Sequence, residues 1–312
     1  MKKFLLTVFS VLLLTGLILI GTYYLGSVTQ RNKLNFKLPD DRNILLVGNS
    51  VGEFAINDSI LSNWANRCFS GQSFLQTSPY LRIALNANAA VDTVVITVDA
   101  HTMTGYSDKL FADRELGYLK ANKSRIIISD QEELDDYKLN KNFPLTYYLS
   151  TGFDLLFRKD KEEGSRFQKL YRNALSKDLS AHYQQLKTGG GKFKSSDEII
   201  KQSSLQVKYL NKMIAECRKH KVACVLMSLP FYRIDEFYDR EGFKDFLSTL
   251  DTTVLIADYS DLVMPDTTYF SDVIHLNYKG ADYISNHIKT NGLKTKKIKE
   301  YLQDSSQNIE QN

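Results

Sequence analysis

The hydrophobic positions of this chain divide it into three regions of different character. Phe4–Leu25 is mostly apolar, and no charged residue occurs before Arg31 once this stretch has begun. From Asn43 to about residue 101, and again from about 205 to 290, short apolar runs alternate with helical patterns. The stretch between them, about 102–200, is rich in charge and tyrosine and lacks that alternation. The pattern predicts an N-terminal helix, an α/β domain and a mainly helical insertion within the domain.

Five short apolar runs in the alternating regions have the composition of buried strands. They are Asn43–Val47, Asn66–Phe69, Thr93–Val98, Val222–Leu229 and Thr253–Ala257. Helical patterns occupy residues 58–64, 73–88, 207–217, 234–250 and 280–289. Strands joined by helical crossovers predict a flavodoxin-like open parallel sheet with helices on both faces. The expected divisions are an anchor with a short tether at 1–30, the α/β domain at 31–300 with its insertion at about 102–200, and a polar tail at 301–312.

The N-terminal apolar stretch is long enough to span a membrane, since a spanning helix needs about 20 such residues. Lys2 and Lys3 precede it and a large polar region follows, which favours a single-pass topology with the soluble domain outside the cytoplasm. A cleaved signal peptide is the rival interpretation. Because the residues around Tyr23–Ser27 offer a poor cleavage site and resemble an aromatic interface anchor, the sequence favours a retained helix.

Composition and charge argue against several classes of function but do not identify one. The net charge of +4 is small and no basic stripe is interleaved with aromatic residues, so nucleic-acid binding is not indicated. The basic run of Lys294, Lys296, Lys297 and Lys299 is typical of a solvated tail. The Gly189–Gly191 run lacks the ending of a phosphate-binding loop and is interpreted as a linker. Neither the histidines nor the cysteines have metal-ligand spacing, so we expect no metal and no cofactor, and Cys217 and Cys224 are expected to be buried.

Two motifs far apart in the sequence carry the candidate chemistry. Ser50 follows the first strand directly, and Asp272 precedes His275 by three residues after the last strand. A serine exposed in a turn can act as a nucleophile, and a carboxylate can hold a histidine in the tautomer that takes the serine proton. Taken alone, each motif favours a structural interpretation, a helix cap for Ser50 and a loop hydrogen bond for Asp272 and His275. Both are expected at the carboxyl edge of the sheet, where ligands bind in such folds, and together they predict a Ser-His-Asp catalytic set.

At these motifs the chain resembles the SGNH/GDSL superfamily of esterases and acyltransferases, over roughly residues 43–104 and 205–290. Gly48-Asn49-Ser50 is similar to the family's nucleophile block, which usually reads Gly-Asp-Ser. Asp272-Val273-Ile274-His275 fits the family's D-x-x-H block. Ser70-Gly71 is similar to the block whose glycine donates its backbone N–H to the oxyanion. The resemblance implies oxyanion donors at the Ser50 and Gly71 amides.

One block departs from the family pattern. The family usually has Gly-x-Asn-Asp after the third strand, with the asparagine as an oxyanion donor, whereas this chain has Asp99-Ala100-His101-Thr102. Asn49, Asp99 and His101 are therefore accessory candidates, and His101 is either a substitute donor or a structural residue. Loss of one oxyanion donor costs about 10²–10³ in rate.

The resemblance is strongest to membrane-tethered members of the alginate O-acetyltransferase-like kind. It implies an esterase or O-acyltransferase that acts outside the cytoplasm on acyl esters of a surface or exported polysaccharide, with a membrane acyl-transfer protein as a further expected partner. The alternative is a non-catalytic, membrane-anchored glycan-binding or assembly protein on the same fold, which the missing asparagine favours. A periplasmic solute-binding domain is a third and more distant hypothesis, since those usually have two sheet domains of similar size.

Overall fold

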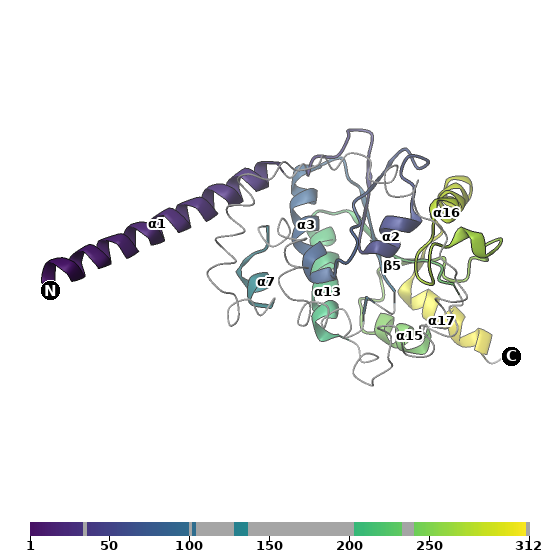
Figure 1. The fold of residues 1–312 in the computed structure, drawn as a ribbon. Coiled ribbons are helices and arrows are strands. Elements are labelled where there is room, and N and C mark those ends of the chain that lie inside the picture. The colour runs from purple at the N-terminus through teal and green to yellow at the C-terminus, as the bar shows by residue number, and fades with distance from the viewer. Residues whose placement is uncertain (34–35, 100–101, 104–127, 137–202, 233–239, 310–312) are drawn as a thin grey trace. The chain divides into compact units, whose positions relative to one another are not determined.

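The fold was analysed in a computed structural model, which describes all residues except 34–35, 100–101, 104–127, 137–202, 233–239 and 310–312 (Figure 1). The chain forms two compact units. One consists of Met1–Phe36 and Asp113–Glu163, and the other of Lys37–Ala112 and Gly164–Asn312. The second unit contains every candidate site residue.

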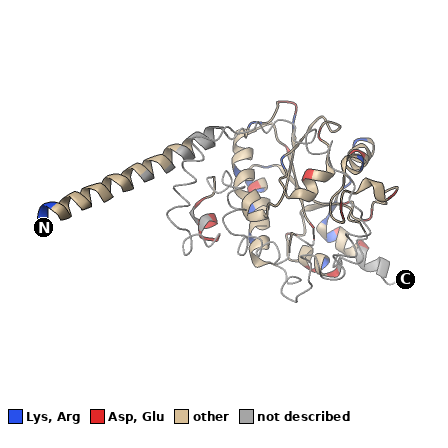
Figure 2. Cartoon of the chain, in the orientation of Figure 1, with Lys and Arg blue, Asp and Glu red and all other residues tan. Residues whose placement is uncertain are grey.

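The first unit contains the apolar N-terminal helix. Helix α1 (Lys2–Lys33) is continuous, with a mean hydropathy of 2.6 over Lys2–Thr22 and no burial of that segment. Its length and composition suit either a membrane anchor or a signal sequence. Figure 2 shows positive charge at the N-terminal end of the helix, where Lys2 and Lys3 lie, followed by uncharged positions. The helix ends later than expected, because the first residues assigned to the tether continue it. The other described helix of this unit is α7 (Gln131–Asp136).

The second unit is built on a six-stranded sheet in the order β2-β1-β3-β4-β5-β6. Its strands are β1 (Ile44–Val47), β2 (Trp64–Asn66), β3 (Thr93–Thr97), β4 (Ala223–Ser228), β5 (Leu255–Asp258) and β6 (Lys296–Lys297). The first five are parallel and β6 is antiparallel to β5. The order of the five parallel strands is the flavodoxin-like one, so the predicted fold class is confirmed.

Helices cover both faces of this sheet. On one face α2 (Ser50–Ala55) packs with α16 (Tyr278–Asn291) over a core that includes Leu46, Val95 and Met227. On the other side α3 (Phe74–Ala87) packs with α13 (Ser204–Lys219), as Figure 1 shows. Two further α-helices among the described residues of this unit, α15 (Arg240–Ser248) and α17 (Ile298–Ile309), pack against each other. Strands buried on both faces explain the near-continuous apolar runs in the sequence.

The helix predicted at residues 58–64 is wrong, because this segment forms turns. The polar residues at the start of this segment make hydrogen bonds that do not belong to a helix. Asn57 Oδ1 accepts from the backbone N–H of Ser59, and the Asp58 carboxylate accepts from that of Asn66. The helix that does follow β1 is α2, which sequence reasoning missed because it has only six residues and contains Gly52.

The C-terminal region also differs from expectation. Residues expected as a polar tail belong to α17, and Lys296 and Lys297 form the edge strand β6 rather than a solvated tail. Both lysines are exposed. Lysine on an edge strand opposes pairing with another chain, which is a structural reason for the basic run. Cys217 is buried as expected, whereas Cys224 is only half-buried.

Most of the expected insertion lies outside the described residues. Within about 102–200 the structure describes only 102–103 and 128–136. The apolar residues 126–127, the amphipathic pattern at 170–186, the Gly189–Gly191 linker and the tyrosines proposed to stack on sugars (Tyr118, Tyr137, Tyr147 and Tyr148) all fall among the residues that are not described.

We expect α1 to remain on the mature protein. Its apolar length suits a spanning helix, and the poor cleavage site after Tyr24 disfavours removal. Intact-mass analysis of protein purified from membranes of its native cells should give the full-length chain. A mature N-terminus between Gly26 and Gln30 would instead show that the helix is a signal peptide.

Candidate active site

Ser50 is placed by a close approach between the chain after β1 and strand β3. Gly48 has φ +149°, and a Cβ atom built on it would lie 1.9 Å from Thr97 Oγ1. Only glycine fits both the dihedral and the space. Asn49 then caps α2, because its Oδ1 accepts from the backbone N–H of Val51 at 3.0 Å. Ser50 is thereby the first residue of the helix, at the carboxyl end of β1.

His275 is placed by a loop that Asp272 and Asn277 hold in shape. Asp272 Oδ1 accepts from the backbone N–H groups of Ile274 and His275 at 3.0 and 2.9 Å. Asn277 caps α16 through its Oδ1, and its Nδ2 donates to the carbonyl oxygens of Thr268 and Phe270. The sequence around the D-x-x-H motif therefore fixes both ends of the loop that carries the histidine.

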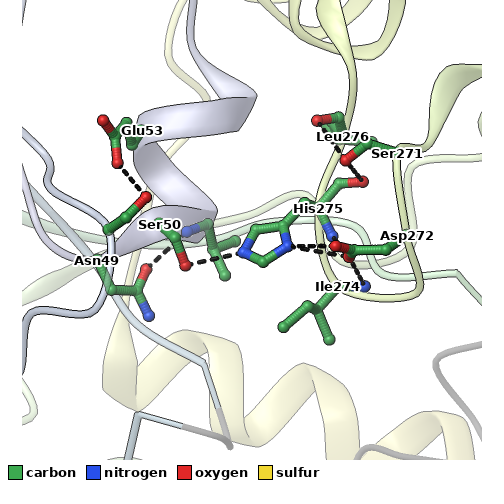
Figure 3. Close-up of polar contacts among 10 residues, drawn as sticks. Asn49, Ser50, Glu53, Ser271, Asp272, Ile274, His275 and Leu276 are labelled. Atoms are coloured by element: carbon green, nitrogen blue, oxygen red, sulfur yellow. Dashed lines mark hydrogen bonds and ion pairs between the residues drawn. The ribbon is translucent and has the colours of Figure 1, made fainter. Parts of the chain in front are cut away.

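The three predicted catalytic side chains form one hydrogen-bonded chain (Figure 3). His275 Nδ1 lies 2.9 Å from each oxygen of Asp272, and its Nε2 lies 2.8 Å from Ser50 Oγ. The carboxylate only accepts, so Nδ1 carries the proton and Nε2 faces the serine as an acceptor. The three side chains are thus hydrogen-bonded to one another in the order that the sequence suggested, with His275 between Ser50 and Asp272. In position and hydrogen bonding it matches a nucleophile, its base and the group that orients the base.

Burial and hydrogen bonding shift the pKa of Asp272 in opposite directions. Burial acts to raise the pKa of its carboxyl, whereas the His275 ring and the backbone N–H groups of Ile274 and His275 act to lower it. The donors prevail, and the pKa of Asp272 lies below its usual value. The ionised carboxylate is therefore the form that faces His275. The Phe54 and His275 rings pack in a T-shaped arrangement, with 5.1 Å between the ring centroids.

Gly71 lies in a tight turn beside the Ser50 segment. The Phe69 N–H donates to the Gly48 carbonyl at 3.0 Å, and the Gln72 N–H donates back to the Phe69 carbonyl. Within the part of the chain that the structure describes, the backbone N–H groups of Ser50 and Gly71 donate to no other protein group. Both amides that the sequence suggested as oxyanion donors are thus available at the same edge of the sheet.

Asn49 and Asp99 belong to a buried network next to the serine. Asn49 Nδ2 donates to Asp99 Oδ2 and lies 3.0 Å from Thr102 Oγ1, while the Thr102 N–H donates to Asp99 Oδ1 at 2.7 Å. Asp99 is only 1% exposed. Asn49 and Asp99 are thus engaged with each other, which suits a structural role. His101 lies outside the described residues.

This network favours asparagine over aspartate at position 49. An aspartate at position 49 would place a second carboxylate about 3 Å from that of Asp99, replacing a donor by an acceptor. Sequence reasoning treated Asn49 and Asp99 separately, because nothing in their 50-residue separation pairs them. It also missed Thr102 and the contact between Glu53 and Ser70 described below.

Comparisons with known proteins find distant structural resemblances. A candidate platelet activating factor from Streptococcus pneumonia has 13% identity and a TM-score of 0.38, covering 91% of this chain and 98% of its own. A candidate acylhydrolase from Bacteroides fragilis has 13% identity and a TM-score of 0.39, covering 87% and 94%. A GDSL-like lipase from Bacteroides thetaiotaomicron has 10% identity and a TM-score of 0.39, covering 85% and 94%. Resemblances this distant do not assign an activity to the chain.

Comparisons with family models and with curated protein sequences do not identify a function for the chain. One family model matches residues 158–296, less than half of the chain, and it carries no description of a function. This match contains Asp272 and His275 but not Ser50. No curated protein sequence matches the chain.

Asn49→Asp should destabilise the fold more than Asn49→Ala. The alanine variant loses a helix cap and two hydrogen bonds, at about 1–2 kcal/mol. The aspartate variant keeps the cap but buries a second carboxylate against Asp99, and we expect about 3 kcal/mol. Unfolding by denaturant at pH 7 and pH 5 checks this. The aspartate variant should recover stability at the lower pH as one carboxylate takes a proton, and equal pH dependence in both variants would contradict the account.

Asp272→Asn should lose stability mainly above about pH 4. The pKa of Asp272 is lower in the folded than in the unfolded chain, where aspartate titrates near 3.9. Its ionised form therefore stabilises the fold above the unfolded pKa, and this contribution is lost as the pH falls through the folded pKa. The difference in unfolding free energy between wild type and variant should be largest near pH 6 and shrink towards pH 3. A difference that grows on acidification would contradict the lowered pKa.

Proposed function

We propose that this protein is a serine-dependent esterase or O-acyltransferase. The observation that carries the proposal is the continuous hydrogen-bonded chain from Ser50 through His275 to Asp272. A serine cap or a loop histidine would not require this alignment, in which the one acceptor nitrogen of the ring faces the serine hydroxyl. The two unused amides at Ser50 and Gly71 supply the second requirement of acyl transfer, a place for the oxyanion.

The proposed reaction has two half-reactions. Ser50 Oγ forms a bond to the acyl carbon while its proton moves to His275 Nε2, and the carbonyl oxygen becomes an oxyanion held by the Ser50 and Gly71 amides. The tetrahedral intermediate collapses, the bond to the leaving alkoxide breaks, and His275 returns the proton to that alkoxide. Water or an acceptor hydroxyl then attacks the acyl carbon and gives its proton to His275. The ester bond to Ser50 Oγ breaks, and His275 returns the proton to Ser50. Hydrolysis and transfer differ only in this second nucleophile.

The proposed substrates are acyl esters of a polysaccharide or another surface polymer outside the cytoplasm. Support comes from the exposed apolar helix α1, which would hold the domain close to polymers made or exported at the membrane. The resemblance to alginate O-acetyltransferase-like proteins points to the same class of substrate, and to a membrane protein that supplies the acyl group. The insertion at about 102–200 is proposed to select the acceptor.

A second candidate function is a non-catalytic glycan-binding or assembly protein. The observation that favours it is Asp99, a carboxylate in the segment where related families carry an oxyanion-donating asparagine. For such a protein the hydrogen bond between Ser50 and His275 would have a structural role and no catalytic one. The two candidates make opposite predictions for the reactivity of Ser50.

Ser50→Ala should abolish both covalent labelling and acyl-ester turnover. We expect the detergent-solubilised wild-type chain to react with a fluorophosphonate probe at Ser50 and to hydrolyse p-nitrophenyl acetate. Loss of the nucleophile should lower kcat by about 10⁴-fold or more. Mass spectrometry of the labelled peptide and a spectrophotometric assay provide the measurements.

A matched control is Ser248→Ala, because Ser248 is an exposed serine at the end of α15 whose hydroxyl bonds only within its own turn. This control should label and turn over ester like the wild type. In cells, Ser50→Ala should also change the acylation of the polymer. If it leaves acylation unchanged while deletion of the whole protein disrupts polymer export, the non-catalytic function is the correct one.

A further inference from the structure

Glu53 and Ser70 make a contact beside the candidate site that the triad does not use. Glu53 lies one helical turn after Ser50 on α2 and is 7% exposed. Its Oε2 accepts a 2.5 Å hydrogen bond from the hydroxyl of Ser70, the residue before Gly71 (Figure 3 shows Glu53 beside Ser50). A hydrogen bond to a carboxylate is roughly twice as strong as one between neutral groups. The helix that begins at the nucleophile thus also binds the turn that carries the second oxyanion amide.

The turn has a conformation that fixes the direction of the Gly71 amide. The Gln72 N–H donates to the Phe69 carbonyl, and the third residue of this turn, Gly71, has φ +73°. Among the described residues Lys221 is the only non-glycine with positive φ, so Ser70 has negative φ. These features define a type II turn. Its closing hydrogen bond uses the Gln72 N–H and leaves that of Gly71 unused.

The alternative conformation of such a turn would misdirect that amide. Types I and II differ mainly by rotation of the central peptide, here the one between Ser70 and Gly71. Conversion to type I would reverse the Gly71 N–H without breaking the closing hydrogen bond. Glycine is permitted in both conformations, so the backbone alone holds the type II form weakly. The Ser70 hydroxyl, tethered to Glu53, is the side-chain contact that anchors the peptide from one end.

We propose that Glu53 is a positioning residue that acts through Ser70 to hold the Gly71 N–H towards the oxyanion. This inference rests on the proposed acyl-transfer function and adds to it a residue that neither touches substrate nor belongs to the triad. Because the carboxylate and the nucleophile share one helix, the Ser50 and Gly71 amides are aligned relative to each other. Preorganised donors of this kind stabilise a transition state because they need no reorganisation during the reaction.

The test is a double-mutant cycle on the detergent-solubilised full chain, with p-nitrophenyl acetate as the probe. Glu53→Ala and Ser70→Ala should each lower kcat by about 10- to 100-fold, since complete loss of one oxyanion donor costs about 10²–10³. KM should change by less than about threefold, because the oxyanion forms after binding. The double variant should be no slower than the slower single variant, since both remove the same contact. Glu53→Gln keeps an oxygen acceptor for Ser70 and should remain within about threefold of wild type.

Glu216→Ala is the matched control, because Glu216 is a mostly shielded glutamate near the end of α13 that contacts Lys219 and His220. It should leave kcat unchanged. Additive losses in the cycle would overturn the proposal, as would variants that lose thermal stability but keep kcat.

Crystal structures of the wild type and of Glu53→Ala separate this inference from the proposed function. The Ser70–Gly71 peptide should be in the type II orientation in the wild type and reversed or disordered in the variant. If the wild type lacks esterase activity and Ser50 labelling, the acyl-transfer function fails, and the inference that rests on it fails too. If the wild type is active but the peptide keeps its orientation in Glu53→Ala, only the role of Glu53 is overturned.

Discussion

The site depends on the close approach of the first helical turn of α2 to strand β3. Thr97 occupies the space that a side chain at Gly48 or Gly52 would need, since Cβ atoms there would lie 1.9 and 2.4 Å from its side chain. Real Cβ atoms do not approach other atoms this closely, so both positions require glycine. Because these positions are glycines, α2 can begin directly after β1 and pack closely against the sheet. The position of Ser50 is therefore fixed by the backbone at Gly48, which precedes it, and by helix α2, which begins with it.

The same approach leads to the pairing of Ser50 with His275. Because α2 lies close to the sheet, α16 can pack beside it on the same face. Gly280 permits a similar close contact at the start of α16, where a Cβ atom would lie 2.4 Å from the Tyr269 carbonyl oxygen. The loop that ends in α16 thus brings His275 to the serine across 225 residues of sequence. The parallel sheet places Ser50 and His275 at the same edge, and the glycines allow the close packing that brings the two side chains together.

The sequence was sufficient for strands β1, β3, β4 and β5 and for the pairing of Ser50, His275 and Asp272, but not for the residues that support them. It placed the second strand at Asn66–Phe69, whereas β2 is Trp64–Asn66, and it missed β6. The strands were predictable because apolar runs buried on both faces leave a clear signal, and Asp272 with His275 because their spacing is local. Contacts between Asn49 and Asp99 or between Glu53 and Ser70 join residues 50 and 17 positions apart. No periodicity encodes such pairs. The helix predicted at residues 58–64 failed for a related reason. Asn57 bonds to Asp282 of α16, and Asp58 accepts from the backbone of Asn66 in β2, instead of capping a helix.

Two carboxylates near Ser50 have different partners, and this difference assigns them different roles. Asp272 faces an ionisable base, and the hydrogen bonds from His275 help to keep its pKa below the usual value. Among the described residues, Asp99 accepts hydrogen bonds from the side-chain amide of Asn49 and the backbone N–H of Thr102. In the proposed reaction the proton of Ser50 moves to the imidazole that Asp272 orients, and Asp99 holds Asn49, the cap of α2, in place. The hydrogen bond between Asn49 and Asp99 thus leaves the Ser50–His275–Asp272 geometry intact.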